Sequence, residues 1–241
     1  MRRRLRTPRA LPTPMRIDFH AHILPHADHG CDGVPTARRQ LDLMRAAGIG
    51  AAVAVAHFYP HRHTAADFLR RRDNGMNLLH SALREGDPRI LAGAEVLLCA
   101  GLEHMEGLER LSIAGSGGVL LLELPYQGMT EELWETIGEI EARGLRPVLA
   151  HLDRYDAAVR RRAAASGLPV QINAAAFQPL LRRPFWKHFC GAENVCALGS
   201  DLHGAEPADY RRFSAALQAL GADGERMMSK TAALLGLEDM K

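Results

Sequence analysis

Histidine and acidic residues stand at the ends of several apolar segments of this 241-residue chain. The first group is the D-x-H-x-H motif at residues 18–22, and the last is the S-D-x-H motif at residues 200–203. Between them, single polar residues end or interrupt apolar segments at His57, Glu95, Glu123 and His151. Imidazoles and carboxylates together are ligands for Zn, Mn or Fe, and carboxylates can bridge two ions. These residue types therefore indicate a multinuclear metal site.

Such a site needs a scaffold that brings distant parts of the chain together. Short β-branched or leucine-rich segments alternate with segments of helical period, which is the pattern of βα units and a parallel sheet. The expected strands cover residues 16–20, 51–57, 90–97, 118–124, 147–151, 169–173 and 195–200. The expected helices cover residues 36–47, 65–85, 130–143, 156–166, 181–189 and 207–220.

Interleaved strands and helices in a chain of this length predict a small α/β fold, a distorted (β/α)7 barrel. An open doubly wound sheet is the alternative, but the sequence contains no G-x-G-x-x-G and no G-x-x-x-x-G-K-[ST] nucleotide motif. In a β/α barrel the C-terminal ends of the strands form the active-site face, so the polar residues would converge there. Strand alternation also places His20 and His22 on one side, where both could hold one ion.

Each of these residues also has an alternative explanation without a metal. A single histidine at a strand end, such as His57 or His151, is often only hydrogen-bonded in the core. An unpaired buried carboxylate at Glu123 is costly and harder to explain in that way. The loops after the first two strands carry further polar residues, which could donate a proton, contact a substrate or simply face solvent: His26, His29, Asp32, His61 and His63.

The four cysteines include no C-x-x-C pair, which favours a reduced cytoplasmic location. Cys31 could suggest a cysteine-dependent phosphatase, whose loop has the spacing C-x5-R. Six residues separate Cys31 from Arg38, however, so we expect no thiol chemistry. The spacing around Ser200 also lacks the G-x-S-x-G nucleophile motif.

The net charge of +2 comes from a basic N-terminus, because five arginines precede Met15. Without them the balance is −3, so the sequence does not indicate nucleic-acid binding. No apolar stretch approaches the roughly 18 residues of a membrane-spanning helix, and we expect a soluble protein. Residues 1–14 are predicted to be a disordered basic extension, or to precede a true start at Met15, and residues 15–241 are predicted to form a single domain.

The motifs together resemble the polymerase and histidinol phosphatase (PHP) superfamily. D-x-H-x-H at 18–22, His57, the G-x-E at 93–95 and S-D-x-H at 200–203 carry this resemblance. Three stretches are more specific and are similar to the bacterial CpsB/YwqE-type protein tyrosine phosphatases of capsule and exopolysaccharide operons: residues 22–30 with H-I-L-P and Asp28, residues 122–124 with L-E-L, and residues 147–155 with P-V-L-A-H-L-D-R-Y. The resemblance extends from Met15 to about Leu237.

This resemblance implies up to three bound ions, Mn²⁺ first, with Fe or Zn as alternatives. One ion would be held by His20, His22, Glu95 and Asp201; a second by Glu95, Glu123 and His151; and a third by Asp28, His57 and His203. Arg154 would bind the phosphate, since a planar guanidinium suits its oxygens. His26 and His61 are further candidate substrate contacts.

The implied activity is hydrolysis of phosphotyrosine by a metal-bound hydroxide. A tyrosinate leaving group with a pKa of about 10 reduces the need for a general acid. The implied partner is the tyrosine-rich tail of a bacterial tyrosine kinase that regulates capsule or exopolysaccharide synthesis. The alternatives are a histidinol-phosphate phosphatase, an amidohydrolase-type deoxyribonuclease and a non-catalytic PHP-like module. Three departures from the family pattern lie where substrate is expected and put the specificity in question: His29, Gly204 and the Phe58-Tyr59-Pro60 stretch.

Overall fold

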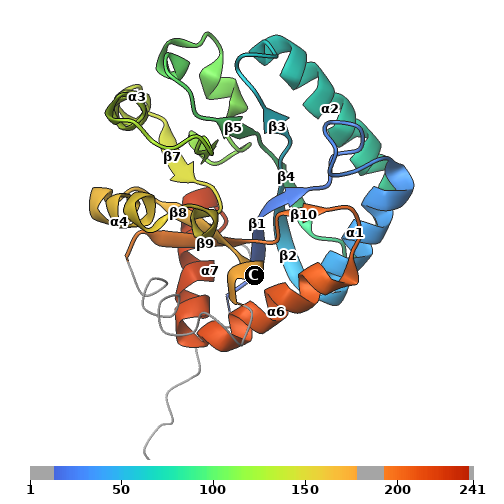
Figure 1. Cartoon of the computed structure of the whole chain (residues 1–241). Coiled ribbons are helices and arrows are strands. Elements are labelled where there is room, and N and C mark those ends of the chain that lie inside the picture. The colour runs from blue at the N-terminus through green and yellow to red at the C-terminus, as the bar shows by residue number, and fades with distance from the viewer. Residues whose placement is uncertain (1–13, 178–192, 239–241) are drawn as a thin grey trace, which may run out of the picture.

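The computed structural model describes residues 14–177 and 193–238, which form a mixed α/β fold (Figure 1). Its strands are β1 (Arg16–His22), β2 (Ile49–Ala54), β3 (His57–Phe58), β4 (Arg89–Ala92), β5 (Glu95–Leu97), β6 (Val119–Glu123), β7 (Arg146–Leu149), β8 (Val170–Asn173), β9 (Val195–Gly199) and β10 (Leu202–His203). Its α-helices are α1 (Val34–Ala46), α2 (Ala65–Ala82), α3 (Glu131–Ala142), α4 (Ala157–Ser166), α6 (Pro207–Leu220) and α7 (Ala222–Leu235). Short 3₁₀ helices are η1 (Leu102–His104), η2 (Leu108–Leu111), η3 (Leu152–Arg154) and η4 (Ala174–Phe177).

The strands pair in parallel and form two sheets, in the orders β10-β1-β2-β4 and β3-β5-β6-β7-β8-β9. The two sheets meet where β2 leads into β3 and β4 into β5, since the backbone N–H of Glu95 donates to Ala56 O at 3.0 Å. At the other end β9 lies beside β1, and the N–H of Asp201 donates to His20 O at 2.7 Å. The expected parallel α/β fold is confirmed, with a distorted strand arrangement divided between two sheets.

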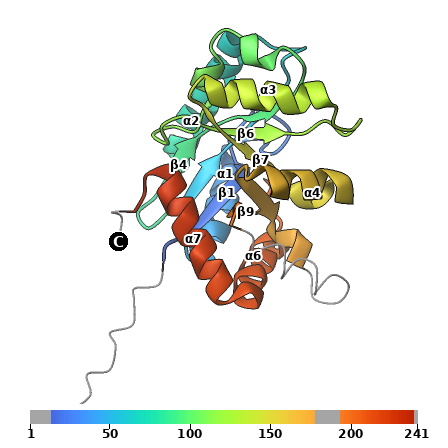
Figure 2. The ribbon, with the colours of Figure 1, turned by 90° about the vertical axis from the view of Figure 1, so that its left-hand side faces the viewer.

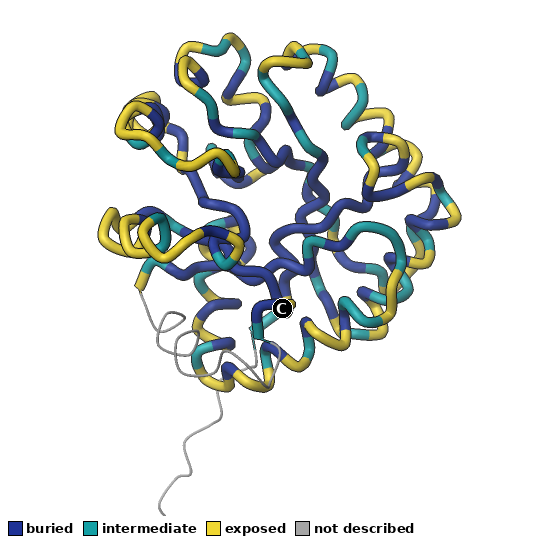
Figure 3. The backbone as a smooth tube through the Cα atoms, viewed as in Figure 1, coloured by how far each residue is buried: buried dark blue, intermediate teal, exposed yellow. Residues whose placement is uncertain are grey.

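The buried interior consists mainly of these strands, and the helices lie around them (Figures 1 and 2). All five residues of β6 are buried, as expected for an apolar parallel strand covered on both faces. The backbone tube is buried through the centre of the molecule and exposed along the outer helices (Figure 3). The buried apolar side chains form one contiguous cluster.

Sequence signals fix several helix ends. The Thr130 hydroxyl accepts a hydrogen bond from the N–H of Leu133 at 3.3 Å and caps α3, as its position before Glu131 predicted. Gly144 follows that helix with a φ of +84°, which favours glycine. The Asp156 carboxylate accepts from the N–H groups of Ala158 and Val159 and caps α4.

The structure differs from the predicted elements in four places. The expected strands 51–57 and 90–97 are each divided, so that His57 and Glu95 begin the separate strands β3 and β5. Neither α7 nor β10 was predicted. Helix α7 follows α6 after only Gly221, and its buried residues Met227, Thr231 and Leu235 recur at helical spacing, a signal present in the sequence.

Two predictions fall outside the described residues. These are the expected helix at 181–189 and, except for Pro14, the basic extension at 1–14. Among the helices that the structure describes, none combines the length and apolar character needed to cross a membrane.

Candidate metal centre

Strand β1 brings His20 and His22 into the interior, where both side chains are fully buried. Their Nε2 atoms lie 3.0 Å apart, which is the shared orientation that strand alternation predicted. Asp18, two residues earlier, anchors the strand: its carboxylate accepts from the N–H of Ser200 at 2.9 Å and from the Tyr210 hydroxyl at 2.7 Å.

Glu95 lies at the centre of the histidine cluster. Its Oε2 is 3.3 Å from His20 Nε2, 3.2 Å from His22 Nε2 and 3.0 Å from His57 Nδ1. Its Oε1 is 2.7 Å from His151 Nε2. One carboxylate therefore contacts four imidazoles delivered by three other parts of the chain, which is the position expected for a bridging ligand.

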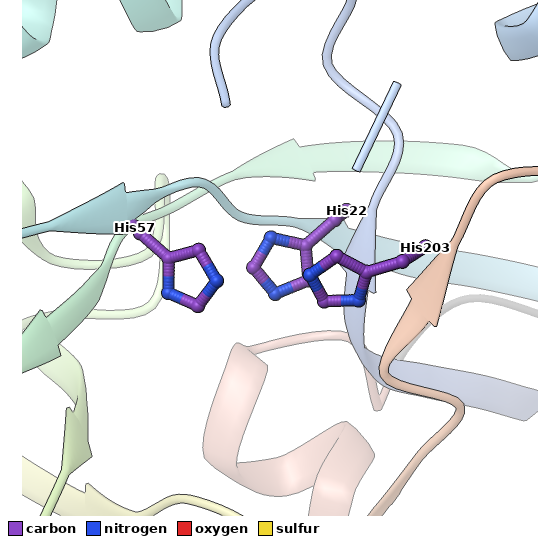
Figure 4. Close-up of side chains that lie close together, drawn as sticks. All are labelled: His22, His57 and His203. Carbon is purple, nitrogen blue, oxygen red and sulfur yellow. The ribbon is translucent and has the colours of Figure 1, made fainter. Parts of the chain in front are cut away.

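Three overlapping groups of ligand atoms each lie within 4.8 Å of one another: His20, His22 and Glu95; His57, Glu95 and Glu123; and His22, His57 and His203. Figure 4 shows the last group, with rings from β1, β3 and β10 gathered at one place. Among the described residues, several buried atoms of these groups have no hydrogen-bond partner: Glu95 Oε2, His57 Nδ1 and His203 Nε2. Buried polar atoms without partners are costly, and bound cations would satisfy them. The residues therefore fit a metal centre.

The remaining acidic residues lie at the edges of the cluster. Glu123 Oε1 is 3.8 Å from His151 Nε2, and Glu123 Oε2 is 4.0 Å from His57 Nδ1. Asp201 Oδ1 is 3.7 Å from the Nε2 atoms of both His20 and His22. The structure thus brings all of these predicted ligands together.

Asp28 has a different set of contacts from the other acidic residues. Its Oδ2 lies 2.7 Å from His22 Nδ1 and accepts from the N–H of His57 at 3.0 Å, while its Oδ1 accepts from the N–H of Gly30. In this arrangement Asp28 orients the His22 ring through the nitrogen that faces away from Glu95. The prediction that Asp28 binds the third ion with His57 and His203 stays a prediction.

The loop histidines separate into two groups. His29 stacks on His57 and His203, with ring centroids 5.2 and 4.6 Å away, and so covers the centre. His26 is exposed, and its ring lies beside Gly33. His61 is exposed and packs near Tyr59, whose ring stacks 5.5 Å from that of His57.

Two carboxyl groups of the cluster have lowered pKa values. Burial opposes ionisation of Glu95, but His20, His151 and His22 outweigh it and hold the pKa of its carboxyl well below the usual value. Burial likewise opposes ionisation of Asp201, and His20 and Arg154 lower its pKa overall. These carboxylates are therefore charged at neutral pH.

The pKa of Glu123 shifts in the opposite direction. Burial raises the pKa of this carboxyl, and the neighbouring charge of Glu95 raises it further. A nearby cation would favour its ionised form.

Burial disfavours a charged ring at His22, but Asp28 and Glu95 outweigh burial and raise the pKa of its imidazole to about 10.

Three residues other than glycine have positive φ in the described chain, and two of them are predicted ligands. His151 has φ +30° and Asp201 has φ +52°, and His26 is the third at +59°. Such backbone conformations are uncommon and persist where the surrounding structure holds them. The strained backbone therefore coincides with the candidate centre.

Arg154 lies in η3, three residues after His151. Its guanidinium donates a hydrogen bond to Asp201 Oδ2, and its side chain is 40% exposed. Burial opposes the charge of Arg154, but Asp201 and Tyr126 raise the pKa of its guanidinium. A permanent cation with an open face thus lies against the candidate centre.

Cys31 has the environment of a structural thiol. It is fully buried, and its Sγ donates to Gly33 O at 3.4 Å. Burial is the main cause of a raised pKa, so the nucleophilic thiolate is disfavoured. This agrees with the expectation of no thiol chemistry.

Sequence reasoning missed two polar residues beside the centre, Gln171 and Asn173 of β8. Both are buried, and both contact predicted ligands. Their alternation along a strand was a readable signal, but amides are not typical ligands for these metals.

A separate group of ligand-type residues lies apart from this centre, on η1 and α3: Glu103, His104 and Glu139.

Comparison with known proteins places the chain in a family. Residues 16–217 match the CpsB/CapC family, whose description is capsular polysaccharide synthesis. The chain belongs to the CpsB/CapC family. None of the curated proteins compared with the chain matches it.

Solved structures agree with the CpsB/CapC assignment at the level of fold. One comes from work on YwqE from Bacillus subtilis and CpsB from Streptococcus pneumoniae, described as metal-dependent tyrosine phosphatases. It has a TM-score of 0.74 at 19% identity and covers 93% of this chain and 96% of that chain. Another, an adenine deaminase from Arthrobacter aurescens, has a TM-score of 0.50 at 14% identity and covers 92% and 97% of the two chains.

Proposed function

We propose that this CpsB/CapC protein is a metal-dependent phosphatase that hydrolyses phosphotyrosine in proteins. The observation that carries the proposal is Glu95, a buried carboxylate contacted by His20, His22, His57 and His151. The same four imidazoles and their neighbouring carboxylates fit Mn²⁺, with Fe or Zn as alternatives. Bound ions would lower the pKa of a coordinated water and offset the charge of the phosphoryl oxygens.

The residues of the chain have separate tasks in this proposal. His20, His22, Glu95 and Asp201 would hold one ion, and Glu123 and His151 would add the ligands of a second that shares Glu95. Asp28, His57 and His203 would hold a third. Arg154 would bind the phosphate through its exposed face, because a guanidinium donates two hydrogen bonds in the plane of two phosphate oxygens. His26 and His61 stay candidate substrate contacts.

The choice of phosphotyrosine rests on the family and on leaving-group chemistry. A tyrosinate has a pKa of about 10 and leaves without strong protonation. The similar structure of YwqE and CpsB comes from proteins described as tyrosine phosphatases. We infer that the substrate is a bacterial tyrosine kinase tail that regulates capsule or exopolysaccharide synthesis. A cytoplasmic location suits that substrate and the described free cysteines Cys31, Cys99 and Cys196.

The test compares phosphate release from a phosphotyrosyl peptide and from histidinol phosphate by Mn-loaded protein. The same protein treated with a chelator serves as the blank. Preference for the peptide, lost on chelation and restored by Mn²⁺, supports the proposal. Preference for histidinol phosphate would keep the metal mechanism and reject the substrate. Hydrolysis that survives chelation would reject the metal mechanism.

A further inference from the structure

Strand β8 differs from its neighbours because its polar residues are amides. Gln171 and Asn173 lie two positions apart, so their side chains leave the same face of the strand. Gln171 is fully buried and Asn173 is 4% exposed. Two buried amides require hydrogen-bond partners, and these partners show which residues of the centre the amides contact.

The orientation of the Gln171 amide follows from one backbone contact. The atom assigned Oε1 lies 2.7 Å from the N–H of His151, and a backbone N–H can only donate, so this atom must be the oxygen. The same oxygen lies 3.3 Å from His20 Nδ1. His20 must therefore carry a proton on Nδ1. In the neutral ring, the lone pair then belongs to the other nitrogen, Nε2, which lies toward Glu95 and His22.

The orientation of Asn173 follows from that of Gln171. Gln171 Nε2 donates to Asn173 Oδ1 at 2.8 Å, which leaves the nitrogen of Asn173 on the other side. That nitrogen donates to Asp201 Oδ2 at 2.9 Å. The second carboxylate oxygen, Oδ1, then faces His20 and His22 at 3.7 Å. One chain of hydrogen bonds thus directs a ligand atom of His20 and a ligand atom of Asp201 toward the same place.

Close packing holds the amide chain against the centre. A Cβ atom added to Gly199 of β9 would lie 2.6 Å from both Gln171 Nε2 and His20 Cβ. Gly199 does not have positive φ, so its backbone conformation does not require glycine. The reason for a glycine here is the small space between the neighbouring side chains. A glycine at this position thus leaves room for Gln171 beside His20 Cβ.

We propose that Gln171 and Asn173 are positioning residues that set the proton location of His20 and the carboxylate orientation of Asp201 for metal binding. This inference rests on the metal centre proposed above. Hydrogen bonds to the distal side of metal ligands typically change metal affinity by about 10- to 100-fold. Neither amide needs to touch a metal or a substrate.

Calorimetric titration of the full chain with Zn²⁺ tests the inference without an activity assay. Gln171→Met keeps the length of the side chain but removes the acceptor at His20, and Asn173→Leu removes the donor at Asp201. We expect each variant to bind Zn²⁺ about 10- to 100-fold more weakly than the unchanged protein. Gln171→Glu keeps an acceptor oxygen for His20 and should bind Zn²⁺ more tightly than Gln171→Met.

Thr231→Val is the matched control. Thr231 is fully buried, and its hydroxyl lies 2.6 Å from Cys196 O and 2.9 Å from Met227 O, neither of which belongs to the centre. The control should lose stability in urea without losing Zn²⁺ affinity. Folded Gln171→Met and Asn173→Leu proteins that bind Zn²⁺ as the unchanged protein does would overturn the inference. If Gln171→Met does not fold, Asn173→Leu decides, because a folded Asn173→Leu protein with unchanged Zn²⁺ affinity would overturn the inference.

The outcomes also separate this inference from the proposed function. Zn²⁺ binding by the unchanged protein without phosphotyrosine hydrolysis would reject the proposed substrate and leave the inference standing. No Zn²⁺ binding by the unchanged protein would overturn the inference together with the metal centre.

Discussion

The guanidinium of Arg154 donates a hydrogen bond to Oδ2 of Asp201, so the proposed phosphate-binding residue is joined to a proposed metal ligand. Asn173 donates to the same oxygen from β8. Arg154 therefore lies directly against the centre. A phosphate held by Arg154 would lie directly beside the place where Asp201 and the histidines meet.

Replacing Arg154 should weaken substrate recognition more than metal binding. A hydrogen bond between charged groups contributes about 1.5–3 kcal/mol, so Arg154→Ala should reduce kcat/KM for a phosphotyrosyl peptide by about 10- to 100-fold. Arg154→Lys keeps the charge but loses the planar pair of donors, and should recover only part of the loss. Steady-state kinetics with Mn²⁺ provide the measurement. An unchanged kcat/KM in Arg154→Ala would show that the residue is a bystander.

Removal of a central ligand should abolish hydrolysis and leave the fold intact. His151→Ala deletes the imidazole that contacts Glu95 Oε1 at 2.7 Å, and Asp201→Ala deletes the carboxylate near His20. Phosphate release and circular dichroism should be measured on the same samples. Full activity in either well-folded variant would contradict the assigned centre.

Cys31→Ser should retain phosphatase activity, because the thiol is buried and its raised pKa disfavours the thiolate. A serine hydroxyl can donate to Gly33 O in place of the thiol. Burying this more polar group should cost stability by about 1–3 kcal/mol. Kinetics and urea unfolding give the two readouts. A folded Cys31→Ser variant with no activity would instead support a mechanism that uses the thiol.

The pair of Arg38 and Asp87 should make stability depend on pH. Arg38 donates to both oxygens of Asp87, at 2.5 and 2.7 Å, and these hydrogen bonds lower the pKa of Asp87 below its ordinary value of 3.8. The stabilisation is therefore present above about pH 4 and is lost as the pH falls through the lower folded-state pKa. Asp87→Asn should cost about 1–3 kcal/mol at pH 7 and less at pH 3.

Asp42→Asn is the matched control for that experiment. Asp42 also accepts from Arg38, at 3.1 Å, but its side chain is 42% exposed, so its loss should cost less than about 1 kcal/mol. Urea unfolding at both pH values provides the data. An Asp87→Asn penalty of the same size at pH 3 and pH 7 would contradict the assigned pKa shift.

Tyr210→Phe should destabilise the protein by about 1–3 kcal/mol, because it leaves an oxygen of the buried Asp18 without its hydroxyl donor. This hydrogen bond joins α6 to β1, the strand that presents His20 and His22. Tyr126→Phe is the control for stability, since Tyr126 is 66% exposed. Equal unfolding midpoints for the two variants would contradict the anchoring role of Tyr210.

The sequence was sufficient to predict that the histidines and acids at the ends of apolar strands lie close together, because the C-terminal ends of parallel strands share one face. It also predicted that His20 and His22 lie on one side of their strand, because side chains two positions apart in a strand point in the same direction. It could not show that Asp28 orients His22, since that contact depends on a loop fold. The left-handed backbone of His151 and Asp201 depends on tertiary packing and has no signal in residue type. Gln171 was missed because its importance comes from the direction of a hydrogen bond.

The pairing of β1 with the segment after β9 has a consequence for biosynthesis. His20 O accepts from the Ser200 hydroxyl across 180 positions of the chain, and Asp201 and His203 follow directly. Because the ribosome makes the N-terminal part first, His20 and His22 exist long before the residues that face them. A nascent chain that ends before Asp201 has an incomplete centre. The two proposed ion sites that include Asp201 or His203 can therefore be completed only late in translation or after it, when the first and last residues of the cluster can meet.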